Sequence, residues 1–140
     1  MPVRGIRGAT IAADNTKEAI LDSTRELLLA MIAANDIQPE DVASVWLTTS
    51  PDLTAEYPAL AARALGWLDV ALLCAHEMAV PHGMKKVVRI LIHHNTDKPA
   101  HAIKRPNPRA LHARHMIQPA PASASRPAPA IATWPRNAVA

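Results

Sequence analysis

The sequence predicts an α/β or α+β domain in which a mixed β-sheet packs with two helices. Segments with strand-like and helix-like patterns follow one another in the order strand, helix, strand, helix, strand, strand. The chain has 140 residues, the length of one domain, and 49% hydrophobic with 19% charged residues is typical of a globular protein. Aromatic residues make up only 3% and Phe is absent, so the core must be largely aliphatic, and burial of a subunit face would add stability.

The first third of the chain predicts a strand and a long helix. Residues 3–12 alternate loosely between glycines, which predicts a first strand carrying Arg4 and Arg7. Asn15, with Glu18 three residues later, makes a capping-box pattern that predicts the start of a helix. The helix is expected to run to about Asn35. Its apolar stripe at helical spacing consists of Ile20, Thr24, Leu27, Leu28, Met31 and Ile32.

The middle of the chain predicts three further strands and a short helix. A turn at 39–41 precedes a strand at 42–49, which is expected to be buried because Val45, Trp46 and Leu47 are too continuous for a half-exposed strand. A short helix is expected from Pro58 to Gly66. A buried strand at 70–74 follows, then a turn at 81–83 and a longer strand at 85–94.

The composition changes near residue 100. Eight of the 13 prolines occur from Pro99 onward, in a Pro/Ala/Ser-rich stretch without either periodicity. We therefore expect a domain at 1–100 and a low-complexity, disordered basic tail at 101–140. Up to residue 100, nine Lys and Arg residues stand against all 12 acidic residues, whereas six Arg and Lys and no acidic residue follow. The net charge of +3 thus comes from the tail, which argues against nucleic-acid binding by the domain.

Cysteine content and hydropathy help to predict the cellular compartment of the protein. Cys74 is the only cysteine, so an intramolecular disulfide is impossible and nothing indicates an oxidising compartment. The N-terminus has no signal-like layout, and no apolar run approaches the roughly 20 residues of a membrane span. We expect a cytoplasmic protein without a membrane partner.

Two arginines on predicted strands are the first candidates for binding chemistry. Arg89 shares a strand face with Val87 and Leu91, and a guanidinium there needs an anionic partner. That partner is either an internal carboxylate or a ligand, and the pattern alone leaves both open. Arg7 raises the same question on the first strand, where the small Gly8 beside it allows close approach to the backbone.

The other candidates have equally open interpretations. Glu77 is either the structural partner of Arg89 or an acceptor for a substrate hydroxyl. Arg63 on the short helix is expected to be exposed. Cys74 fits a small core residue better than a nucleophile, because no histidine stands at a catalytic spacing from it. His93 and His94 point to opposite strand faces, so we interpret them as surface histidines rather than metal ligands.

No cofactor or metal motif is present in the sequence. It contains neither G-x-G-x-x-G nor a P-loop nor a cysteine pair. What remains is a set of arginines with one carboxylate. Such a set suits an anionic ligand and a reaction that needs neither nucleophile nor metal, so we expect no cofactor.

The motifs around these residues resemble, in order and spacing, those of the AroH-class chorismate mutases, which are monofunctional, trimeric and barrel-like. The resemblance covers about residues 3–98, and the opening R-G-I-R-G-A-T motif is specific. The matching stretches are 4–10, 49–53, 57–59, Arg63, 66–67, Cys74, 77–78 and 85–89.

The resemblance implies a homotrimeric pseudo-barrel with active sites between adjacent subunits. It implies an isomerase that rearranges chorismate to prephenate without a cofactor, in the shikimate pathway to phenylalanine and tyrosine. Catalysis would come from holding a compact conformer and stabilising developing charge.

The resemblance also assigns roles by position. Arg89 would contact the ether oxygen and a carboxylate, Arg7 a carboxylate, and Glu77 the ring hydroxyl. Cys74 would lie near that hydroxyl, with Tyr57 and Arg63 at the mouth of the site. The implied catalytic residues are Arg89, Glu77 and Arg7, and the implied substrate-binding residues are Arg7, Tyr57, Arg63, Cys74, Glu77 and Arg89.

Three departures from the family pattern leave alternatives open. The turn at 79–83 differs, Leu60 stands where a basic residue is common, and the closing segment with its Tyr and Leu-Arg-Pro stretch is not recognisable. The Tyr position falls near Asn107, between prolines that a central strand excludes. A shifted reading frame or a divergent tail would explain this. The alternative functions are an inactive or weakly active trimeric binding or regulatory protein, and an anion- or nucleic-acid-binding module.

Overall fold

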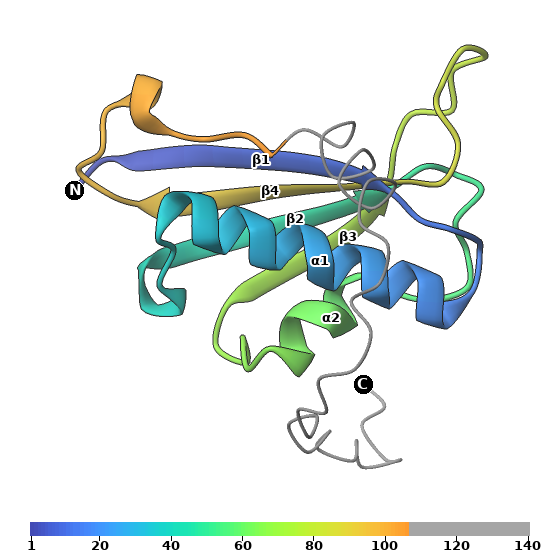
Figure 1. The fold of residues 1–140 in the computed structure, drawn as a ribbon, viewed down its shortest axis with the longest axis horizontal. Helices are drawn as coiled ribbons and strands as arrows, with labels where there is room; N and C mark the ends of the chain where they lie inside the picture. The colour runs from blue at the N-terminus through green and yellow to red at the C-terminus, as the bar shows by residue number, and fades with distance from the viewer. Residues whose placement is uncertain (107–140) are drawn as a thin grey trace, which may run out of the picture.

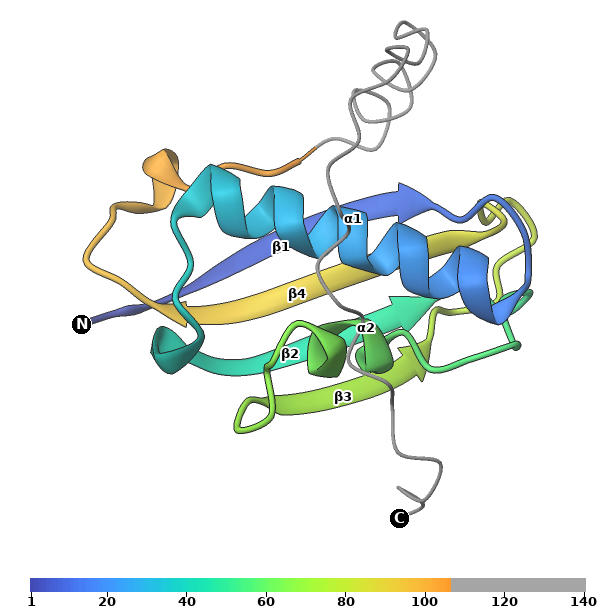
Figure 2. The same ribbon diagram turned by 60° about the horizontal axis from the view of Figure 1, so that its bottom comes forward.

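A four-stranded mixed sheet with two helices on one face forms the domain (Figures 1 and 2). The computed structural model describes residues 1–106. The elements in chain order are β1 Val3–Ile11, α1 Lys17–Asn35, the 3₁₀ turn η1 Pro39–Asp41, β2 Val42–Thr49, α2 Ala59–Ala64, β3 Ala71–His76, β4 Val87–Asn95 and η2 Ala100–Ala102. The predicted fold class and element order are confirmed.

The sheet order is β1-β4-β2-β3, so the last strand lies in the middle of the sheet. β4 pairs antiparallel with β1 on one side and with β2 on the other, whereas β2 and β3 are parallel. The parallel pair is joined through α2, which packs against β3 on the same face as α1 (Figure 2). Because β4 is central, its side chains determine much of what each sheet face presents.

The helix α1 begins one residue later than the capping-box pattern predicts. Thr16 is the N-cap, and its hydroxyl accepts a hydrogen bond from the backbone N–H of Ala19 at 3.1 Å. Asn15 instead holds a distant loop: its side-chain oxygen accepts from the backbone N–H groups of Thr54 and Ala55. The predicted cap was therefore wrong, because the Asn15 side chain is engaged by a loop that lies 39 residues away in sequence.

The core lies between α1 and the sheet. The predicted stripe of α1 is confirmed, with Ile20, Thr24, Leu27, Leu28 and Met31 fully buried and only Ile32 partly buried. Gly8 of β1 allows the close approach of this helix, since a Cβ at that position would lie 2.8 Å from the Met31 sulfur. The helix is thereby pressed onto the N-terminal strand, next to Arg7.

The opposite face of the sheet is not covered by helices, and this corrects two sequence-based expectations. Trp46 of β2 is 45% exposed and Leu73 of β3 is 51% exposed, although both strands were expected to be buried. The side chains of β2 alternate between the two faces of the sheet. Val45 and Leu47 pack under the helices, whereas Trp46 points away from them. We refer below to this uncovered side of the sheet as the open face.

The histidine pair on β4 divides between the two faces. His93 lies on the open face, where its Nδ1 atom is 2.9 Å from the Ser44 hydroxyl oxygen. His94 points into the helix side and is only 4% exposed, and neither ring nitrogen has a hydrogen-bond partner among the described residues. The interpretation of both as surface histidines was thus wrong for His94, because strand alternation places it on the same face as Ile90 and Ile92.

Asn35, at the end of α1, holds the segment that follows β4. Its side-chain amide accepts from the backbone N–H of Lys104 at 2.8 Å and donates to the Lys104 carbonyl at 2.9 Å. The ammonium of Lys98 donates to the Asn35 carbonyl at 2.7 Å. Asn35 is 2% exposed, so these contacts satisfy a buried amide and direct the segment along β1 (Figure 1).

The expected tail at 101–140 lies largely outside the described residues, as does the position near Asn107. Within the described part, residues 101–106 begin with the end of η2 and continue beside β1. Among the helices of residues 1–106, none has the length and apolar character needed to cross a bilayer.

We expect the protein to lose stability in mild acid through His94. Burial, the largest effect, lowers the pKa of His94 below its ordinary value; Lys98 also lowers the pKa, whereas Asp41 and Asp36 raise it. The His94 imidazole therefore binds its second proton more readily in the unfolded chain than in the folded one. As a result, the free energy of unfolding keeps its full value above a pH of about 6.5 and falls as the pH drops toward the pKa of His94 in the folded protein.

Urea unfolding at a series of pH values, with His94→Leu as the comparison, measures this effect. The wild-type unfolding free energy should decline more steeply between pH 7 and pH 5 than that of the variant. Parallel curves for the two proteins would contradict the prediction.

Candidate active site

A groove on the open face gathers three of the residues predicted to contact a substrate. Arg7 comes from β1, Arg89 from the central β4, and Glu77 directly follows β3. The groove has a volume of about 640 Å³ and is also lined by Trp46 and Thr48 of β2. Four neighbouring strands or strand ends thus contribute to one concave surface, which is the usual form of a small-molecule site.

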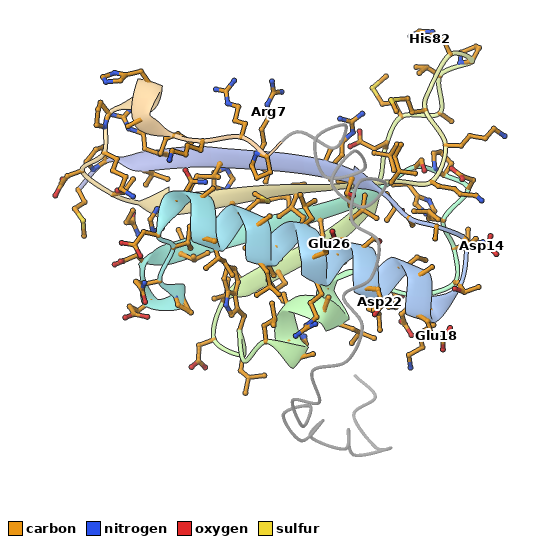
Figure 3. All side chains as sticks on the ribbon, viewed as in Figure 1. Arg7, Asp14, Glu18, Asp22, Glu26 and His82 are labelled. Carbon is orange, nitrogen blue, oxygen red and sulfur yellow. The ribbon has the colours of Figure 1, made fainter. Side chains whose placement is uncertain are left out.

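The register of the sheet brings the two arginines to the same face. Ala9 stands opposite Arg89 and Leu91 stands opposite Arg7 across the β1–β4 ladder. Arg7 and Arg89 are therefore diagonal neighbours, and both project from the open face. Figure 3 shows the Arg7 side chain pointing away from the helices. Two guanidinium groups on a concave surface provide a site for an anion with more than one charged oxygen.

Arg89 and Glu77 form an ion pair within this groove. The Nε atom of Arg89 is 3.2 Å from Oε1 of Glu77, and the side chains are 51% and 37% exposed. The same carboxylate oxygen accepts a hydrogen bond from the Thr48 hydroxyl at 2.6 Å. Glu77 is thus the structural partner of Arg89, which was one of the two interpretations of the sequence, and it also lines the groove.

The start of β4 is determined by a polar turn. Lys86, the residue before the strand, has a positive φ of 55°, and its backbone N–H donates to Oδ2 of Asp52 at 2.9 Å. The Ser50 hydroxyl accepts from the backbone N–H of Val87. The side-chain hydrogen bond from Ser50 is the largest effect that lowers the pKa of Asp52, with the backbone N–H of Lys86 adding to it. These contacts hold an unfavourable backbone conformation three residues before Arg89.

Tyr57 and Cys74 lie at a second pocket, apart from the Arg89 groove. This pocket of about 440 Å³ is formed by β3 and the loop that leads into α2. Cys74 stands in register with the buried Leu47, so its thiol lies on the helix side of the sheet, not beside the Glu77 carboxylate. Arg63 is exposed on α2 as expected and lines neither pocket.

The predicted site residues thus fall into two groups within one chain. Arg7, Glu77 and Arg89 meet at the open face, whereas Tyr57 and Cys74 meet on the other side of β3 and Arg63 stands nearby on α2. Within one chain, Tyr57 and Cys74 therefore line a different pocket from Arg7, Glu77 and Arg89.

Three residues of the groove, Thr48, Arg105 and Pro106, were not predicted from the sequence. Thr48 looks like an ordinary strand residue, and only the register opposite Arg89 reveals its contact with Glu77. Arg105 and Pro106 line the same groove although they belong to the stretch expected to be a tail. The local sequence around Arg105 does not predict its position in the groove. Asn35 brings this segment to the sheet through hydrogen bonds to Lys104, which lies 69 residues away in sequence.

The described residues contain no group of three or more His, Cys, Asp or Glu side chains placed to hold a metal ion. The charged and hydroxyl groups that line the groove are three guanidinium groups, one carboxylate and one hydroxyl. Such groups bind an anion and stabilise charge that develops on oxygen during a reaction.

Comparisons with known proteins identify the family of the chain. The sequence model of the family described as chorismate mutase type I matches residues 3–112. The chain is 48% identical over 103 residues to the chorismate mutase AroH of Thermus thermophilus, which covers 73% of this chain and 84% of the relative. It is 44% identical over 105 residues to that of Bacillus subtilis, covering 74% and 83%.

A solved structure is similar as well. The chorismate mutase from Clostridium thermocellum superposes with a TM-score of 0.73 at 39% identity, covering 77% of this chain and 98% of that one.

We expect Cys74 to react slowly with alkylating reagents. Burial raises the pKa of its thiol, an effect that the nearby backbone of Ala59 only partly offsets. Since the thiolate is the reactive form, the rate of modification at neutral pH should be below that of a free cysteine and should rise at alkaline pH. Because Cys74 is the only cysteine, iodoacetamide labelling followed by mass spectrometry measures this rate without ambiguity. Labelling of native protein as fast as that of urea-unfolded protein would contradict the expectation.

Proposed function

This chain belongs to the chorismate mutase type I family and has chorismate mutase function, and from this premise we propose that the groove on the open face is its active site. Three residues contact chorismate there: Arg89, Arg7 and Glu77. The observation that carries the proposal is the Arg89–Glu77 pair, whose 3.2 Å contact orients a half-exposed guanidinium on the central strand. The enzyme is an isomerase of the intramolecular transferase type, acting in phenylalanine and tyrosine biosynthesis.

The reaction is an intramolecular rearrangement of a dianion. The ether C–O bond of chorismate breaks while a new C–C bond forms, so no proton, nucleophile or cofactor takes part in the bond changes. Two things lower the barrier: holding the side chain over the ring in a compact conformer, and stabilising negative charge on the departing ether oxygen.

The residues of the groove match these two requirements. The guanidinium of Arg89 donates to the ether oxygen and to a carboxylate, an interaction that strengthens as the oxygen gains charge and so raises kcat. Arg7 binds a carboxylate from the neighbouring strand. Glu77 accepts from the ring hydroxyl through its second oxygen, because Oε1 already contacts Thr48 and Arg89.

The active enzyme is a homotrimer with its sites between subunits. The divided arrangement of the predicted residues supports this: Tyr57, Arg63 and Cys74 of one chain join Arg7, Glu77 and Arg89 of the next. The open face supports it too, because exposed Trp46 and Leu73 form an apolar surface that association would bury. A cytoplasmic location stays a prediction from the sequence.

Replacement of Arg89 tests the function directly. In a spectrophotometric assay of chorismate disappearance, the wild-type chain should turn over chorismate, and Arg89→Ala should lower kcat by at least roughly 10²–10³-fold. Arg89→Lys should be similarly impaired, because a point charge does not reproduce the planar fork of donors. Arg89 is 51% exposed, so neither change should lower the melting temperature much.

The Arg89 experiment needs one control variant, and one outcome would refute the proposed function. Arg25→Ala removes an exposed arginine from α1 and should leave turnover unchanged. A folded wild-type chain without conversion of chorismate would refute the proposed enzyme and would favour a binding protein on the same fold.

Replacement of Leu73 by Glu tests the subunit arrangement. A buried carboxylate at the open face should dissociate the trimer and abolish turnover, because each site would lose the residues of the neighbouring chain. Size-exclusion chromatography with light scattering reports the mass. Leu29→Glu is the matched control, since Leu29 is 41% exposed on the outer side of α1 and its replacement should leave the trimer intact. A monomeric but fully active Leu73→Glu protein would refute sites between subunits.

A further inference from the structure

Thr48 makes one of the shortest side-chain contacts in the groove. Its hydroxyl donates to Oε1 of Glu77 at 2.6 Å, and the same oxygen lies 3.2 Å from Nε of Arg89. The fold enforces this meeting at two points: Thr48 stands opposite Arg89 in the β2–β4 ladder, and the backbone N–H of Glu77 donates to the Thr49 carbonyl at 2.8 Å. The three side chains therefore converge from three adjacent strands.

The geometry of this contact differs from the usual arginine–carboxylate pair. A free pair tends to align both carboxylate oxygens with two N–H groups of the fork. Such an arrangement would occupy the carboxylate and the outer edge of the guanidinium together. Here the Thr48 hydroxyl donates to Oε1, the same oxygen that lies 3.2 Å from Nε of Arg89, and among the described residues Oε2 of Glu77 has no hydrogen-bond partner. Because both residues line the groove, Oε2 and the terminal guanidinium nitrogens are left for a ligand.

We infer that Thr48 is a positioning residue of this active site, which keeps Glu77 and Arg89 from closing on each other so that both can bind chorismate. This inference rests on the proposed function of the groove. Thr48 acts through Glu77 and does not take part in bond making, because the rearrangement needs neither a nucleophile nor a proton. Its effect should appear in turnover, where the orientation of both partners matters most.

Thr48→Val is the decisive substitution, because valine keeps the shape of threonine and replaces only the hydroxyl. Valine is well suited to a strand, so the fold should be kept and the melting temperature should not fall. We expect kcat to drop roughly tenfold, the effect of losing a hydrogen bond to a charged group, with a smaller change in KM. Thr48→Ser restores the hydroxyl and should keep turnover within about twofold of wild type.

Two further measurements separate positioning from a structural role. In the Glu77→Gln background the Thr48→Val change should cost little more, because the partner through which Thr48 acts is already altered. Ser44→Ala removes a hydroxyl from the same strand and face, where it contacts His93 and not the groove, and should leave kcat unchanged. A Thr48→Val enzyme with wild-type kcat, a loss that Ser does not rescue, or an equal loss in Ser44→Ala would each overturn the inference.

A crystal structure of Thr48→Val tests the inference without any assay of turnover. The Glu77 carboxylate should rotate to a two-oxygen contact with Arg89, and an unchanged carboxylate would overturn the inference. If the wild-type chain failed to convert chorismate while this rotation occurred, the proposed function would fail and the positioning by Thr48 would stand.

Discussion

The sheet is covered by helices on one face only. Because side chains alternate along a strand, each strand therefore contributes one set of side chains to the core and the other set to the open face. Side chains such as Ile90 and Ile92 of β4 pack under α1, and the residues between them must project from the open face. Because β4 is central, Arg89 emerges in the middle of that face, with partners on both sides. The same packing that builds the core therefore places a guanidinium and its carboxylate on a surface available to a ligand.

The ion pair between Arg89 and Glu77 has little to do with holding the fold together. Pairs as exposed as this one contribute about 0–1 kcal/mol, whereas the aliphatic core under α1 supplies the main stabilisation. Under the proposed function, the pair serves to orient the Arg89 guanidinium. A guanidinium held at Nε loses little further entropy when its other nitrogens bind an anion, so binding energy is available for the transition state.

Under the proposed function, the open face takes part in both catalysis and assembly. Trp46 lines the groove and also forms part of the exposed apolar surface with Leu73. A neighbouring chain on this surface would exclude water from the groove, and hydrogen bonds to charged groups gain strength in a drier environment. Under the proposed arrangement, association would add buried apolar area to the small core of the single chain. It would also bring the two groups of site residues together.

The sequence by itself determined the elements and most of their bounds, because strand alternation, helical spacing and turn residues act over a few neighbours. It also indicated Arg7, Glu77 and Arg89, through motifs and through the cost of leaving a charge without a partner. The tertiary structure decided which face each strand buries, as the exposed Trp46 shows. It also decided the N-cap of α1, since a loop 39 residues away engages Asn15.

Long-range contacts account for the features that sequence patterns missed. Neither the contact of Thr48 with Glu77 nor the approach of Arg105 to the groove follows from its local sequence. The first depends on the strand register, and the second depends on the buried Asn35 amide. These contacts join residues far apart in the chain, and a pattern read over a few neighbouring positions cannot contain them.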